Sequence, residues 1–119
     1  MRDGSVASVR HGRTVFGAVV VVSLVVLFAP AGDVPSAPPG VDKVVHAVLF
    51  LALAATGRWA GLRAAFLLPA LVAYAAGSEV LQGLSGIGRT ASVLDWAADV
   101  VGVVAGLALW ARLAGPARR

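Results

Sequence analysis

Ionisable side chains with the spacing needed for chemistry lie beside or inside the apolar stretches of this sequence. Asp42 and His46 are one helical turn apart, so the carboxylate can orient the imidazole and raise its basicity, as in many general bases and metal sites. Glu79 and Gln82 are three residues apart on a predicted helix and can therefore share one partner. These pairs suit acid–base chemistry or polar-ligand binding, although a single histidine at a helix start is more often an interfacial residue without a chemical role.

A second group follows one face of a predicted helix near the C-terminus. At about 100° per residue, Ser92, Asp95, Asp99, Gly102 and Gly106 fall within a stripe of about 80°. Ser92 and Asp95 also match a capping box, whereas Asp99 lies one turn deeper, where a carboxylate must be paired or neutral. Gly102 and Gly106 form a small-xxx-small pattern, which predicts close packing against another helix.

The composition indicates what kind of scaffold must position these groups. Of the 119 residues, 59% are hydrophobic and only 13% are charged, against about 25% in ordinary soluble domains. Four apolar segments have roughly the length needed to cross a bilayer, which predicts an all-α membrane protein with a four-helix transmembrane bundle. The predicted segments span residues 14–31, 42–59, 64–82 and 93–113. One membrane domain, residues 14–113, then lies between an N-terminal tail, 1–13, and a basic tail, 114–119.

Several function classes have no support in the sequence. The chain has no cysteine, which excludes disulfides and thiolate metal sites. Its net charge of +4 comes from arginines near segment ends rather than from a solvated basic run, so no nucleic-acid partner is predicted. The spacing of ionisable residues matches no specific metal or cofactor motif, and none is predicted. For the first segment, a secretory signal peptide is the alternative, because Ala29-Pro30-Ala31 resembles a cleavage site.

The arginines predict the orientation of the bundle. They gather before the first segment, in the turn after the second and after the fourth, so the positive-inside rule places both termini in the cytoplasm. Because consecutive spans run antiparallel, the start of the second segment, the end of the third and the start of the fourth meet at the outer leaflet. The predicted outer cluster comprises Asp42, Lys43, His46, Glu79, Gln82, Arg89, Ser92, Asp95 and Asp99.

The outer cluster holds more acidic than basic groups. Its four carboxylates face two cations, Lys43 and Arg89, which leaves two excess negative charges when His46 is neutral. Arg89 is the simplest partner for Glu79 across the loop that joins the third and fourth segments. The remaining balance can come from a protonated His46, a protonated Asp99, a metal ion or a cationic group of a ligand.

The order and spacing of these residues resemble a known family. Asp42-Lys43-x-x-His46-x-x-x-Phe50, Glu79-x-x-Gln82, Gly88-Arg89 and Ser92-x-x-Asp95, followed by Gly102 and Gly106, are similar to the VanZ-like family of small bacterial membrane proteins. The resemblance implies four spans in the bacterial plasma membrane and, from the family's namesake, an accessory role in resistance to teicoplanin-type glycopeptide antibiotics. Two features depart from the family pattern. Asp99 stands where asparagine is common, and residues 84–87 replace a proline-containing approach to the arginine.

The residues are compatible with several classes of function. The leading hypothesis is an accessory or binding protein of the cell envelope, whose outer cluster recognises a lipid-like or glycopeptide ligand at the outer leaflet, with membrane lipids as constant partners. A second is a membrane hydrolase or transferase that uses Asp42 and His46 as the base and Arg89 to stabilise an anion. A third is a proton-coupled carrier, and a fourth is a polar network with a purely structural role. The sequence does not specify the oligomeric state.

Overall fold

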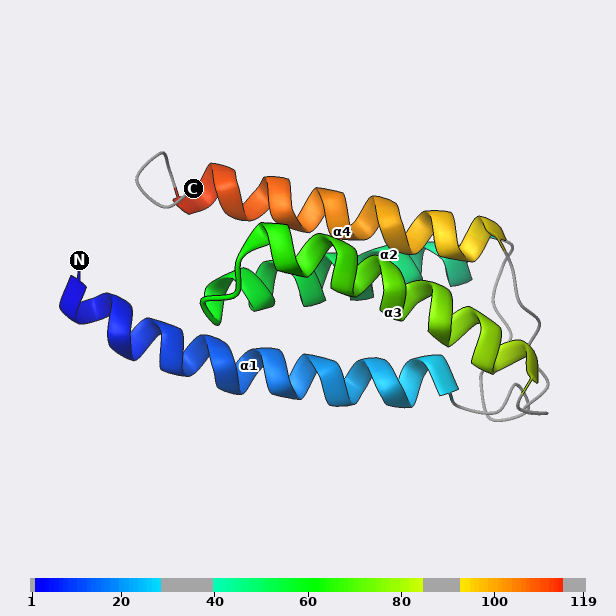
Figure 1. The fold of residues 1–119 in the computed structure, drawn as a ribbon, viewed down its shortest axis with the longest axis horizontal. Helices are drawn as coiled ribbons and strands as arrows, with labels where there is room; N and C mark the ends of the chain where they lie inside the picture. Colours follow the sequence, from blue (N-terminus) through cyan, green and yellow to red (C-terminus); the bar gives the residue numbers. More distant parts are fainter. Residues whose placement is uncertain (1, 29–39, 85–92, 115–119) are drawn as a thin grey trace.

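The computed structural model describes residues 2–28, 40–84 and 93–114, with the side chains of residues 2–6 and 42 left out. These residues form four α-helices, which confirms the all-α prediction (Figure 1). The helices are α1 (Arg2–Phe28), α2 (Val41–Trp59), α3 (Ala64–Leu84) and α4 (Val93–Ala114). The last three match the predicted segments to within two residues at either end.

Helix α1 extends beyond the predicted apolar segment, which begins at residue 14, because the helix already starts at Arg2. Residues 2–13 are polar but contain no proline, so nothing in the backbone stops the helix there. Two contacts hold this part of α1 against α2. Trp59 Nε1 donates a hydrogen bond to Ser8 Oγ over 2.8 Å, and Gly12 lies so close to the Trp59 backbone that a Cβ there would meet its carbonyl at 2.6 Å. The polar N-terminal segment is therefore a helical continuation of the first apolar segment.

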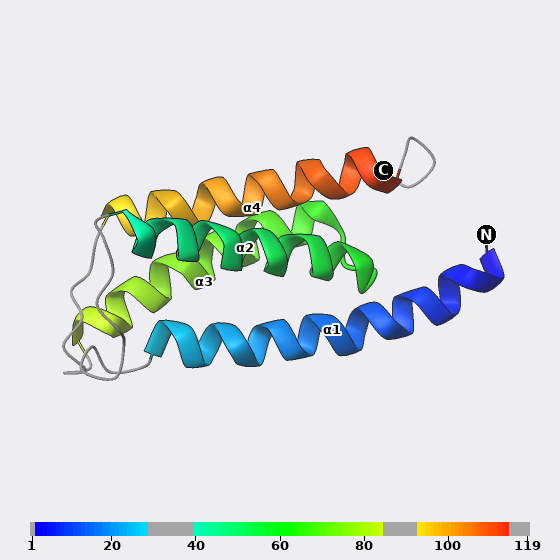
Figure 2. The same ribbon diagram turned by 180° about the vertical axis from the view of Figure 1, so that it is seen from behind.

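The four helices lie side by side in an elongated bundle of 47 × 24 × 22 Å (Figures 1 and 2). We call the end that holds the start of α1, the α2–α3 turn and the end of α4 the terminal end. The opposite end, with the start of α2, the end of α3 and the start of α4, is the cluster end. Helix α2 contacts the other three helices and packs most extensively against α4, so it is the central element.

A tight turn joins α2 to α3 at the terminal end. Gly61 has a φ of 93°, a conformation that residues with a Cβ rarely adopt, and the backbone reverses there through a hydrogen bond from Leu62 N to Gly57 O. Arg58 Nη1 also donates to Leu62 O over 2.7 Å and so satisfies a backbone acceptor of the turn. This short connection makes α2 and α3 antiparallel neighbours.

The bundle is apolar outside and holds polar groups inside. Large hydrophobic side chains are exposed on α1, α3 and α4, among them Val25 (64%), Leu81 (55%) and Val101 (64%). By contrast, the buried polar side chains among the described residues are Ser23, His46, Ser78, Glu79, Gln82 and Asp99. Helices α1, α3 and α4 are long and apolar enough to cross a membrane, and this inverted polarity fits a lipid environment. The structure therefore indicates an integral membrane protein.

Candidate functional site

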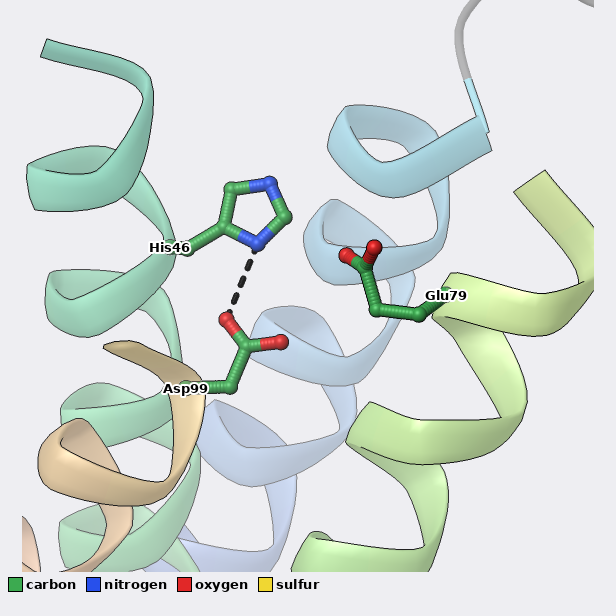
Figure 3. A group of neighbouring side chains, drawn as sticks. All are labelled: His46, Glu79 and Asp99. Carbon is green, nitrogen blue, oxygen red and sulfur yellow. Dashed lines mark hydrogen bonds and ion pairs between the residues drawn. The ribbon is translucent and has the colours of Figure 1, made fainter. Parts of the chain in front are cut away.

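Three buried ionisable side chains from three helices meet towards the cluster end (Figure 3). His46 of α2, Glu79 of α3 and Asp99 of α4 are 2%, 4% and 0% exposed. His46 Nδ1 lies 2.9 Å from Asp99 Oδ1, which is a hydrogen-bond distance; when Asp99 is ionised, the imidazole Nδ1–H group donates to its carboxylate. One potential metal-ligating atom from each residue lies within 4.8 Å of the other two. We call these three residues the buried cluster.

The register between α2 and α4 brings His46 to Asp99. The two helices run in the same direction from the cluster end, and contacting residues are separated by about 53 positions along the chain. The contacting pairs are Lys43 with Asp95, His46 with Asp99, Ala47 with Gly102 and Leu51 with Gly106. A Cβ at Gly102 or Gly106 would overlap the carbonyl oxygen of its partner, so only glycine allows the two backbones to lie this close.

Lys43 and Asp95 form an ion pair next to the buried cluster. Lys43 Nζ lies 3.2 Å from Asp95 Oδ1, and the two side chains are 44% and 14% exposed. The pair therefore lies nearer to the surface of the bundle than His46 and Asp99 do. Trp96, the residue after Asp95, donates from its indole nitrogen to the Val72 carbonyl over 3.4 Å and so links α4 to α3.

Gln82 makes a contact that the sequence does not predict. Its side-chain amide donates a hydrogen bond to the Leu27 carbonyl, one of the last carbonyls of α1, which have no partner within their own helix. Gln82 therefore ties α3 to the end of α1. Glu79, one turn earlier, points towards His46 and Asp99 (Figure 3).

A second unpredicted polar contact lies partly buried between α1 and α3. Ser23 Oγ donates to the Val20 carbonyl over 2.7 Å, and it therefore accepts the hydrogen bond from the Tyr74 hydroxyl at 2.8 Å. A serine alone in a valine-rich segment is a detectable signal, because a buried hydroxyl in an apolar helix needs a partner. The sequence holds no clue that this partner is Tyr74.

Some of the predicted site residues lie outside what the structure describes. Arg89 and Ser92 belong to the segment 85–92, and this segment and the side chain of Asp42 are outside the described part of the chain. The predicted pairing of Glu79 with Arg89, the capping role of Ser92 and the pairing of Asp42 with His46 therefore stay predictions. The described carboxylate partner of His46 is Asp99, which the sequence places at the same end of the bundle without pairing it with the histidine.

The buried cluster can take part in two kinds of chemistry. An imidazole whose Nδ1–H group is held by a carboxylate has a defined tautomer, in which Nε2 can act as a base or a ligand. An imidazole and two carboxylates also form a mixed nitrogen and oxygen donor set that suits divalent metal ions. No family model matches the chain, and no curated protein or solved structure is significantly similar to it.

Proposed function

We propose that this protein crosses the bacterial plasma membrane four times, with both termini in the cytoplasm. Helix α2 supplies the fourth span. Its 19 residues extend about 28 Å, close to the roughly 30 Å hydrocarbon thickness. Lys43 and Arg58 lie near its two ends, where their side chains can reach the interfaces. The positive-inside rule orients the bundle, since Arg10, Arg58 and Arg112 all lie towards the terminal end.

Cysteine labelling in intact cells tests this topology. The chain has no cysteine, so single substitutions report without background. Val41→Cys at the cluster end and Ala64→Cys at the terminal end replace exposed residues at the starts of α2 and α3. A membrane-impermeant maleimide should label Val41→Cys in intact cells and Ala64→Cys only after lysis. The reverse pattern, or the same behaviour at both sites, would contradict the proposed orientation.

The function we propose is that of an accessory protein of the cell envelope. Its cluster end binds the polar group of a lipid-like or lipopeptide molecule, while the apolar part of that molecule lies against the bundle in the membrane. The observation that carries this proposal is the concentration of buried His46, Glu79 and Asp99 at one end of a bundle with an apolar exterior. The resemblance to VanZ-like proteins points to glycopeptide resistance as the process that such binding would serve.

Antibiotic susceptibility of a sensitive bacterium tests the accessory role. Cells that express the wild-type protein should tolerate more teicoplanin than cells without it, and vancomycin serves as the comparison drug. Glu79→Gln and Asp99→Asn should abolish this protection at unchanged membrane abundance. Ser23→Ala is the matched control, because it alters a buried polar contact that is not part of the buried cluster. Full protection by the cluster variants, or none by the wild type, would overturn the proposal.

A membrane hydrolase or transferase is the second candidate, and one observation favours it. The 2.9 Å contact between His46 and Asp99 is the geometry that orients an imidazole as a general base. In this alternative, Asp99 takes the positioning role that local spacing assigns to Asp42. Turnover of a lipid-linked cell-wall precursor by the purified protein, lost in His46→Gln, would support an enzyme. Binding of the same precursor without turnover would support the accessory protein instead.

A further inference from the structure

The buried cluster also has the composition of a metal site. We propose that His46, Glu79 and Asp99 bind one divalent first-row transition-metal ion, such as Zn²⁺, between α2, α3 and α4. This proposal does not depend on the accessory role, because it concerns the affinity of the protein for a metal ion alone.

The distances in the buried cluster are close to those of a coordination shell. With metal–ligand bonds of about 2.1 Å, two donors of a tetrahedral zinc site lie about 3.4 Å apart. The 2.9 Å between His46 Nδ1 and Asp99 Oδ1 is about half an ångström shorter than this separation. The metal ion would replace the proton on Nδ1, and that proton would move to Nε2, so the imidazole stays neutral. The largest separation in the set is 4.8 Å or less, so a small inward movement completes the site.

Glu79 is suited to make this movement. Its side chain comes from a separate helix and directs its carboxylate towards the other two residues (Figure 3). It also has more rotatable bonds than Asp99 or His46, so its carboxylate can approach without a shift of α3. The positions of His46 and Asp99 depend more directly on the close packing of α2 against α4, which supplies a preorganised pair of donors.

The charge and chemistry of the donors select the class of ion. The donor set comprises two carboxylates and a neutral imidazole, and the negative charge of the carboxylates attracts a divalent cation. This attraction is strong because all three side chains are at least 96% buried in an apolar bundle, where charges are poorly screened. The imidazole favours Zn²⁺ and similar transition metals over Mg²⁺ and Ca²⁺, which prefer oxygen donors only. Three protein donors leave at least one position for water or an anionic ligand atom.

Metal titration of the purified full-length chain, without a polyhistidine tag, tests the proposal. After treatment with a chelator, Zn²⁺ should bind with a stoichiometry of one per chain in calorimetry. His46→Ala and Asp99→Asn should each weaken binding by more than about 100-fold, since changes outside the first coordination shell alone cost about 10- to 100-fold. His11→Ala is the matched control, because His11 is the other histidine of the chain and is exposed on α1.

The His11→Ala protein also provides a readout with the buried cluster intact. His46 is then the only histidine, so its proton signals in NMR should be strongly shifted by bound Co²⁺. This measurement shows whether the metal ion binds at His46 even if the His46→Ala and Asp99→Asn variants fail to fold. Absence of Zn²⁺ binding to the wild type, loss of binding in His11→Ala, unchanged affinity in folded His46→Ala, or His46 signals unaffected by Co²⁺ would each overturn the proposal.

Discussion

The close approach of α2 and α4 predicts that Gly102→Ala separates the two helices. A Cβ at residue 102 would overlap the Ala47 carbonyl oxygen and lie 2.9 Å from its carbonyl carbon and 3.0 Å from its Cα. These are backbone atoms, which cannot rotate away as a side chain can. Relief of the overlap requires movement of roughly an ångström, and a gap of that size forfeits about half of the dispersion energy of the contacts it opens.

The size of the effect is best expressed relative to a second glycine substitution. Overpacking costs about 1–3 kcal/mol, whereas alanine stabilises a helix interior by about 1 kcal/mol relative to glycine. Gly77→Ala on α3 has only the second effect, because nothing lies within 4 Å of its added Cβ. The free energy of unfolding of Gly102→Ala should therefore be lower than that of Gly77→Ala by about 1–3 kcal/mol.

Reversible unfolding in mixed micelles with increasing dodecyl sulfate measures this difference. Circular dichroism follows helix content, and Gly17→Ala on α1 serves as a second control with an open environment. Gly102→Ala should also weaken Zn²⁺ binding, because Ala47 directly follows His46 in the sequence. If Gly102→Ala is as stable as Gly77→Ala, the backbones of α2 and α4 are not in contact and the reasoning about their register fails.

Three further predictions use the same unfolding measurement. Asp99→Ala removes the carboxylate that accepts the Nδ1–H group of buried His46 and should cost about 1–3 kcal/mol; an unchanged midpoint would contradict this contact. Lys43→Ala should cost less than about 1 kcal/mol, because its ion pair is 44% exposed on the lysine side, and a larger loss would indicate a more central role. Tyr74→Phe should cost about 0.5–1.5 kcal/mol through loss of its hydrogen bond to Ser23, and stability equal to the wild type would refute that bond.

The sequence is sufficient to locate the helices because their signals are strong and local. Each apolar segment ends at proline, glycine or charged residues, and length alone separates membrane-scale helices from shorter elements. The predicted segment 14–31 covers only the apolar part of α1, which begins at Arg2, because polarity does not mark where a helix starts. Polarity indicates only that these residues are not in hydrocarbon. Their helical structure is stabilised by contacts with α2, such as that between Ser8 and Trp59, which lie 51 positions apart.

The arrangement of the site is harder to predict from the sequence, because the pairing of residues between helices depends on how the helices are shifted relative to one another. Antiparallel connections suffice to predict that α2, α3 and α4 present their polar residues at one end of the bundle. The choice of partners within that end does not follow from connectivity. Local spacing favours Asp42 as a partner of His46, and that pairing stays a prediction, whereas nothing in the spacing indicates Asp99, which the structure places 2.9 Å from His46 on another helix. The spacing of residues along one helix does not determine how the neighbouring helix is rotated about its axis or how far it is shifted along the bundle.

The glycines of α4, considered together with its acidic residues, indicate how α4 is positioned against α2. On α4, Asp95, Asp99, Gly102 and Gly106 form one continuous stripe, and the two glycines meet α2 at Ala47 and Leu51. Close backbone contact at two successive turns permits only one depth of α4 along α2, because a shift by one residue would bring a side chain into the seam. At that depth Asp99 lies beside His46. The packing of the glycines and the geometry of the buried cluster are therefore one feature, and a substitution at either glycine should disturb both stability and metal affinity.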